Sequence, residues 1–150
     1  MATPRLFFLM DRAHRALFRA ADREMQNRLG ISSAQLGLLF YIGAHENCLM
    51  GELAAGLDLR PNAVTGLIQR LKRDGFVETS PSERDRRATH LQLTDRGREA
   101  VRDAVPVVQQ ANQQLIGDFS DAEIAVIARF FTHVIDLPSP QTLSQEPSHD

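Results

Sequence analysis

Apolar residues recur at spacings of three and four over most of this chain, which indicates a mainly helical fold. The first such stretch predicts a helix over about residues 4–29, ended by Gly30. The next predicts a helix that continues to about Ala44. Its start is marked by Ser32 and Gln35, which have the spacing of a capping box.

The C-terminal third predicts two further helices. One is expected to run from about residue 95 toward Phe119, with a kink before Pro106, because proline removes a helical hydrogen bond. The other is expected after Ser120, since Ser120 and Glu123 again have capping-box spacing. Residues 138–150 are rich in Pro, Ser and Gln, so we expect a mobile tail there.

The middle of the chain predicts a pair of short helices followed by a hairpin. A helix over 51–57 and a turn at 58–60 precede a second helix that begins at Pro61, where a missing N–H has no cost. Beyond Gly75 the apolar period changes to two, so strands are expected near 76–79 and 89–94. The expected fold is therefore mainly α with a small β-wing, in the order of a winged helix–turn–helix.

The first predicted helix is apolar on more than one side, because Phe7, Phe8 and Phe18 broaden its main stripe. A helix this long needs more partner surface than one small domain offers. We therefore interpret its start as part of a dimer interface. A purely intramolecular core is the alternative.

Charge is distributed unevenly, although the net charge is only −2. Residues 1–30 have six Arg against three acids, and residues 60–99 have nine basic residues against six acidic ones, so each segment carries +3. Residues 31–59 carry −3 and residues 121–150 carry −4. The positive charge thus gathers at the first helix and at the helix–turn–helix with its hairpin, as in a protein with a nucleic-acid-binding face.

The second helix of the pair has the residue types that a helix in a DNA major groove needs. Asn62 can pair with adenine, and Ala63 and the Thr65 methyl group suit the thymine methyl. Arg residues in the hairpin suit a narrow minor groove. The candidate DNA-binding residues are Arg60, Asn62, Ala63, Thr65, Gln69, Arg70, Lys72 and Arg73 in the helix, and Arg84, Arg86 and Arg87 in the hairpin.

These segments resemble the MarR-type winged helix–turn–helix transcriptional regulators over about residues 5–137. The resemblance is carried by residues 51–54, 64–71, 75–77, 85–87 and 93–97. It implies a homodimer on a pseudo-palindromic operator in double-stranded DNA, commonly a repressor that is released by a small phenolic or anionic compound. It also implies that Asp85 orients Arg87 in the wing.

The domain organisation implied is a single unit over 1–137. The DNA-binding winged helix would span about 32–95, and the dimerisation helices about 4–29 and 96–137. By the same resemblance, an effector would lie between the first helix, the second helix and the helix after the wing. Candidate lining residues there are His14, Arg15, Phe18 and Phe40.

The sequence departs from the family pattern at specific positions. Arg60-Pro61 replaces the usual Ser or Thr at the helix start, so its N-cap should be weak. Gly66 replaces a longer polar residue, which costs about 1 kcal/mol of helix propensity relative to Ala. Pro106 lies in the region where ligands of the family bind.

Other function classes find less support. No His or Cys spacing predicts a metal site, no motif predicts a cofactor, and no catalytic constellation predicts an enzyme. Cys48 is expected to be a buried hydrophobic residue. With no signal peptide or membrane span, a cytoplasmic location is expected. The alternative function is a winged-helix protein–protein interaction module, which the net charge of +3 over residues 60–87 disfavours.

Overall fold

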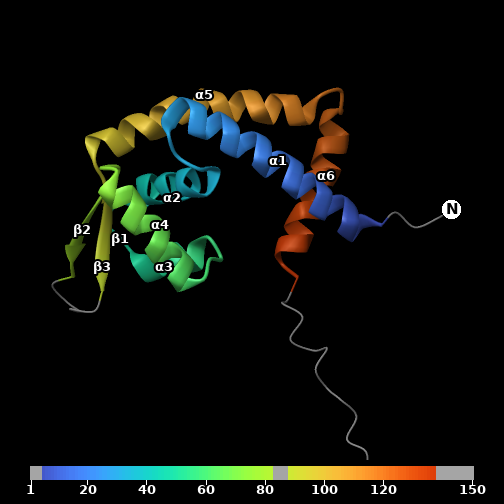
Figure 1. Cartoon of the computed structure of the whole chain (residues 1–150). Coiled ribbons are helices and arrows are strands. Elements are labelled where there is room, and N and C mark those ends of the chain that lie inside the picture. The colour runs from blue at the N-terminus through green and yellow to red at the C-terminus, as the bar shows by residue number, and fades with distance from the viewer. Residues whose placement is uncertain (1–4, 83–87, 138–150) are drawn as a thin grey trace, which may run out of the picture. The chain divides into compact units, whose positions relative to one another are not determined.

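The structure is a computed structural model that describes residues 5–82 and 88–137 (Figure 1). It confirms the expected class, which is mainly helical with one small sheet. The elements in chain order are α1 (Leu6–Leu29), α2 (Ser33–Ala44), β1 (Cys48–Leu49), α3 (Met50–Gly56), α4 (Pro61–Arg73), β2 (Val77–Pro81), β3 (Thr89–Leu93), α5 (Asp95–Ile116) and α6 (Asp121–Ile135).

The chain divides into two compact units, residues 1–109 and residues 110–150. The first contains α1–α4, the sheet and the first part of α5, and the second contains the end of α5 and α6. Whether residues 32–95 bind DNA while the flanking helices dimerise stays a prediction.

The sheet of the first unit has the strand order β1-β3-β2, with both pairs antiparallel. Cys48 lies opposite Leu91, and Val77 lies opposite Leu93. The core of this unit gathers the inward side chains of the helices and the sheet. Its fully buried large members are Ile31, Leu38, Leu39, Ile42, Leu53, Val64, Ile68, Leu71, Val77 and Leu91.

The connection between α1 and α2 follows the local signals in the sequence. Gly30 adopts a left-handed conformation at the end of α1, with φ of 69°. The Ser32 side chain accepts a hydrogen bond from the Gln35 backbone, and the Gln35 side chain accepts one from the Ser32 backbone, so the predicted capping box is confirmed. The Asp22 carboxylate in α1 also accepts hydrogen bonds from the backbone and hydroxyl of Ser33, at 2.8 and 2.5 Å.

α5 runs through Pro106 without a break, so the expected interruption does not divide this helix. Pro106 has no N–H to donate to the carbonyl of Arg102, and the expected kink at this point stays a prediction. The helix ends at Ile116 rather than near Phe119, because Gly117 adopts a left-handed conformation with φ of 50°.

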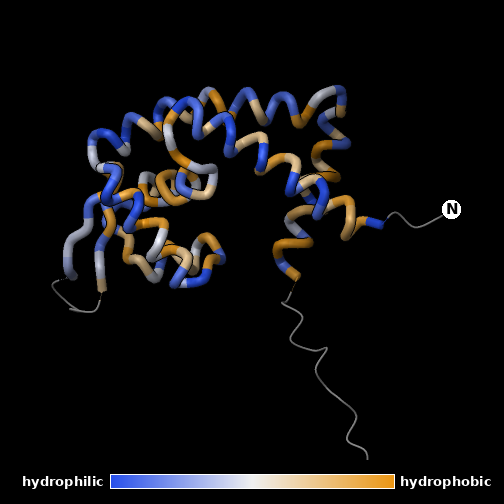
Figure 2. Tube along the Cα trace, viewed as in Figure 1, coloured by the Kyte–Doolittle hydropathy of each residue, from blue (hydrophilic) through white to orange (hydrophobic). Residues whose placement is uncertain are grey.

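α6 begins with the predicted capping box of Ser120 and Glu123. None of its residues is buried, although apolar residues occur along its length (Figure 2). The start of α1 is similar, since Phe7 is 80% exposed. Both helices therefore present apolar side chains that the described part of the chain leaves exposed.

Candidate nucleic-acid interface

α4 has one side in the core and the opposite side in solvent. Val64, Ile68 and Leu71 are buried, as the apolar pattern predicted, and Leu67 is half-buried. This fixes which residues face outward. The exposed residues are Pro61, Asn62, Ala63, Thr65, Gln69, Arg70, Lys72 and Arg73, and all of them except Pro61 are among the predicted DNA-binding residues.

The start of α4 lacks a side-chain cap, as its sequence predicted. Arg60 occupies the N-cap position in an extended conformation, with φ of −67° and ψ of 136°, and its side chain makes no capping hydrogen bond. Pro61 follows at the first helical position. Pro61 has no N–H, and the N–H groups of Ala63 and Val64 donate to the Arg60 carbonyl oxygen at 2.9 and 3.2 Å. Among the described residues, this leaves the Asn62 N–H of the first turn for solvent or for an anion such as a DNA phosphate.

Thr65 uses its hydroxyl within the helix. The hydroxyl group donates to the carbonyl oxygen of Pro61, four residues earlier, at 2.9 Å. A hydroxyl has one hydrogen, so none remains for a base. What Thr65 can offer to a partner is therefore its methyl group and an acceptor oxygen.

The cationic residues of α4 differ in how freely they can move. Within the described residues, Arg60 and Arg70 make no ion pair or hydrogen bond with another side chain. Lys72 donates to the Thr79 hydroxyl of β2 at 2.7 Å, which links α4 to the hairpin. Arg73 forms an ion pair with Asp74 at 2.9 Å, and its hydrogen bond lowers the pKa of Asp74. Arg60 and Arg70 are thus the cations most available to phosphates.

The wing is the hairpin of β2 and β3, and its base is well defined. The Ser82 N–H donates to the Ala88 carbonyl at 2.9 Å and closes the loop that joins the two strands. The five residues within that closure include the predicted wing residues Arg84, Asp85, Arg86 and Arg87. They lie outside the described residues, so their roles stay predictions.

The sequence did not signal how β3 is anchored to the turn between α2 and β1. Asn47 in that turn has a positive φ of 60°. His90 Nδ1 lies 2.8 Å from the Asn47 carbonyl oxygen, and Gln92 Nε2 donates to the Asn47 side-chain oxygen. An Asn in a short turn indicates a left-handed residue, because Asn tolerates that region. It does not indicate which strand the Asn contacts.

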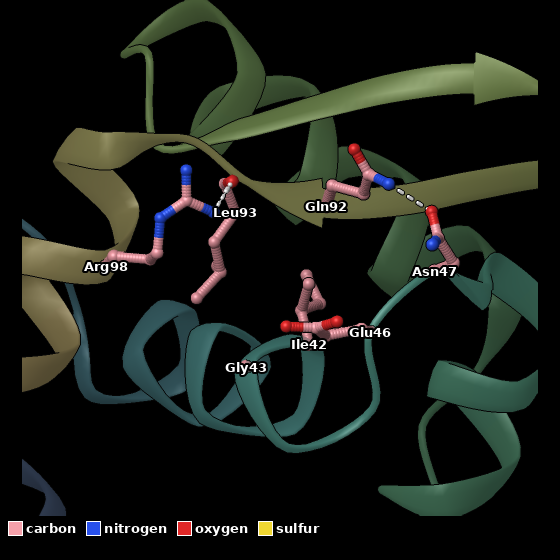
Figure 3. A pocket seen from close by; sticks show the side chains of 7 residues that line it. All are labelled: Ile42, Gly43, Glu46, Asn47, Gln92, Leu93 and Arg98. Carbon is pink, nitrogen blue, oxygen red and sulfur yellow. Dashed lines mark hydrogen bonds between the residues drawn. The ribbon is translucent and has the colours of Figure 1, made fainter.

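A pocket of about 210 Å³ lies between the end of α2 and strand β3 of the wing (Figure 3). It is lined by residues from the end of α2, the following turn, β3 and the start of α5, namely Ile42, Gly43, Glu46, Asn47, Gln92, Leu93 and Arg98. Arg98 is held by the Leu93 carbonyl and by Asp95, each at 2.7 Å. The volume is below the roughly 300–1,000 Å³ of small-molecule sites, so we assign no ligand to it.

The predicted effector residues are arranged as follows. The rings of His14 and Phe18 lie 4.3 Å apart on α1. Arg15 forms an ion pair with Asp11 in the same helix, and Phe40 packs partly buried against the core. A pocket that joins these four residues stays a prediction.

Two other properties concern the described part of the chain only. It contains no group of three or more His, Cys, Asp or Glu side chains that could hold a metal ion. None of its helices is both long enough and apolar enough to cross a membrane.

Cys48 is buried, as predicted, and burial raises the pKa of its thiol.

Comparison with known proteins places this arrangement among DNA-binding regulators. The model of the MarR family matches residues 29–88. The chain is 29% identical to the transcriptional activatory protein BadR of Rhodopseudomonas palustris over 136 residues, which cover 88% of this chain and 77% of BadR.

Two solved structures share the fold. MepR of S. aureus, in a complex with DNA, superimposes with a TM-score of 0.80 at 20% identity, covering 90% of this chain and 98% of MepR. BpsR of Bordetella bronchiseptica, whose DNA binding is regulated by 6-hydroxynicotinic acid, has a TM-score of 0.78 at 24% identity. That match covers 87% of this chain and 98% of BpsR.

Proposed function

The chain belongs to the MarR family of winged-helix transcriptional regulators, and on that premise we propose that it is a homodimeric repressor that binds a pseudo-palindromic operator. The observation that carries the proposal is the outward face of α4. That face carries mostly polar or small side chains and lies on a helix whose other side is fixed in the core. Arg60 at the N-cap and Arg70 have no side-chain partner among the described residues.

In this proposal α4 enters the major groove of double-stranded DNA. Asn62, Ala63 and Thr65 meet base edges, and Gln69 reaches a base or a phosphate. The cations at the two ends of the face, Arg60 and Arg70, bind phosphates, with weaker contributions from Lys72 and Arg73. Arg84, Arg86 and Arg87 of the wing extend the contact to the minor groove, with Asp85 orienting Arg87.

Operator binding is tested with DNA selected in vitro from random sequence by the purified protein. Arg70→Ala should weaken binding of the selected site about tenfold at fixed salt, as expected for the loss of one phosphate contact in each protomer. Arg102→Ala removes the same charge from the exposed face of α5 and should leave affinity unchanged. If the wild-type protein selects no sequence at all, the interaction-module alternative replaces this proposal.

Dimerisation is supported by the apolar side chains of α1 and α6 that are exposed in the described part of the chain. Phe7 on α1 and Ile135 on α6 are each 80% exposed, and their neighbours include further exposed apolar residues. Exposed apolar side chains that gather on one helix suit an interaction site. Light scattering should give the mass of two chains, and Phe7→Asp combined with Ile135→Asp should shift it toward one chain.

The effector is proposed to be a small aromatic or anionic compound bound near His14, Arg15, Phe18 and Phe40. The support is the nearness of an imidazole to an aromatic ring on α1, and the regulation of BpsR by an aromatic acid. Aromatic acids that bind the folded protein should raise its melting temperature and release operator DNA. Phe18→Ala should abolish both effects, and a panel of such acids that produces neither effect would contradict the proposal.

We propose that the protein represses transcription. We also propose that it acts in the cytoplasm, where DNA is accessible to it. BadR bears the name of an activator, so direction needs its own measurement. A reporter gene driven by the selected operator should be less active when the protein is present. Increased activity would reverse this part of the proposal and leave DNA binding intact.

A further inference from the structure

Gly66 lies at the centre of the outward face of α4. We propose that Gly66 is a specificity-determining residue, and that its missing side chain makes room for the 5-methyl group of one operator thymine. This inference rests on the proposed function, because it assigns a role within the complex of α4 with the major groove.

The position of Gly66 follows from helix geometry. Residues advance about 100° around a helix, so Gly66 lies opposite the buried side of Val64, Ile68 and Leu71. Its neighbours on the same face are Asn62 one turn before it, and Gln69 and Arg70 one turn after it. The helix therefore presents bare backbone where the centre of its polar face would meet a groove.

The fold gives no internal reason for a glycine at this position. A Cβ built on Gly66 has no atom within 4 Å, and the backbone is helical. By contrast, a Cβ on Gly56 would collide with the Tyr41 ring, and one on Gly97 with the Phe76 carbonyl oxygen. Glycine inside a helix is less favourable than alanine, so Gly66 lowers the stability of α4 without improving its packing.

Open space by itself does not indicate function, because Gly37 in α2 is equally unobstructed. The difference is what surrounds the two positions. Gly66 is bordered by exposed side chains that suit base recognition, and Gly37 lies on a different helix. A residue that lowers stability on an exposed binding face is best explained by close approach of the partner.

The chemistry around Gly66 favours an A·T pair as the neighbour. Asn62 and Gln69 have amides, which pair with the N6 and N7 atoms of adenine. The thymine opposite that adenine projects its 5-methyl group into the major groove. Thr65 has no hydroxyl hydrogen left to donate and offers a methyl group beside this contact. Because Gly66 has no side chain, α4 leaves space for about one methyl group at the place where thymine carries its 5-methyl group.

The test adds a methyl group to the protein and, separately, removes one from the DNA. Gly66→Ala adds a methyl group to α4, and replacing thymine by uracil removes one from the operator. Each thymine of the selected half-site is replaced in turn, and affinity is measured by fluorescence anisotropy for wild type, Gly66→Ala and the control Gly37→Ala.

At one thymine position, uracil should weaken wild-type binding about fourfold, which is the contribution of one buried methyl group. Gly66→Ala should bind the thymine operator about tenfold more weakly, through crowding at the interface. It should recover most of that loss on an operator with uracil at that position of both half-sites, because both protomers of the proposed homodimer carry the substitution. Gly37→Ala should behave as wild type on every DNA.

Stability separates this effect from misfolding. Gly66→Ala should melt roughly 2–4 °C above wild type, because alanine favours the helix. Stability and DNA affinity then move in opposite directions. Equal affinities of wild type and Gly66→Ala, or the same thymine preference in both, would overturn the inference while the proposed function stands. Failure of wild type to bind any site would overturn both.

Discussion

Gly97, in the first turn of α5, packs directly against the backbone carbonyl oxygen of Phe76. A side chain at this position would overlap that oxygen and would also come within 3.3 Å of Leu93. The contact sets how closely α5 follows the strand that leads into it. Arg96, the preceding residue, reinforces the junction by placing its guanidinium 4.5 Å from the centre of the Phe76 ring.

Gly97→Ala should therefore destabilise the protein by about 1–3 kcal/mol, because backbone atoms of Phe76 cannot move aside as a flexible side chain can. Urea denaturation followed by circular dichroism measures the difference. Gly37→Ala is the matched control, since the added methyl group meets no atom there. Equal midpoints for Gly97→Ala and wild type would show that α5 can shift without cost.

Asp22→Ala should cost about 1 kcal/mol at pH 7, because it removes the acceptor for two hydrogen bonds from Ser33 at the start of α2. This loss of stability is small because Asp22 is exposed to solvent. Asp22→Asn keeps an acceptor oxygen and should lose less. Thermal melts of the three proteins give the comparison.

The contribution of Asp22 should also depend on pH. Hydrogen bonds from Ser33 lower the pKa of Asp22 below its ordinary value of 3.8. A lowered folded-state pKa gives stability that is fully present above pH 3.8 and is lost as the pH falls through the folded-state value. The difference between wild type and Asp22→Ala should therefore shrink in acid below about that pH. A difference that stays constant from pH 7 to pH 2 would contradict this role.

Thr65 allows a test of which of its groups meets DNA. Its hydroxyl is bonded to Pro61, so Thr65→Val, which keeps a methyl group, should retain operator affinity within about twofold. Thr65→Ser, which loses the methyl group, should weaken binding about fifteenfold, the contribution of one methyl contact in each protomer of the proposed homodimer. The reverse order in a binding titration would mean that the hydroxyl leaves Pro61 to contact a base.

Asp74 restrains Arg73, so removing the restraint should strengthen DNA binding. Asp74→Asn breaks the ion pair and frees the Arg73 guanidinium for a phosphate. The slope of log affinity against log salt should become steeper by about 1.8, the value for one more neutralised phosphate at each protomer of the proposed homodimer. In an Arg73→Ala background the same substitution should not change the slope.

The sequence was sufficient for features that depend on neighbouring residues. Both capping boxes, at Ser32 and Ser120, and the left-handed Gly30 were predicted because each is encoded within a few positions. The inward face of α4 was predicted because a helix repeats its orientation regularly. Boundaries were less exact, as at the end of α5, since no sequence rule fixes which residue of a terminal turn leaves the helix.

Contacts between distant segments could not be predicted in this way. The bonds of Asp22 to Ser33, of Asn47 to His90 and of Lys72 to Thr79 join separate elements, and each depends on tertiary packing. The sequence ranked Arg70, Lys72 and Arg73 alike as phosphate contacts. The structure distinguishes them, because only Arg70 has no partner among the described residues.

The short strand β1 has a consequence for how the parts of the winged helix can move. Cys48 and Leu49 pair with β3 of the wing, and Met50, the next residue, begins α3. Lys72 ties the other wing strand to α4. The wing, α3 and α4 are thus coupled through short connections, and none can swing independently without breaking backbone or side-chain hydrogen bonds. A rearrangement that keeps these hydrogen bonds therefore has to move the wing, α3 and α4 together as one body.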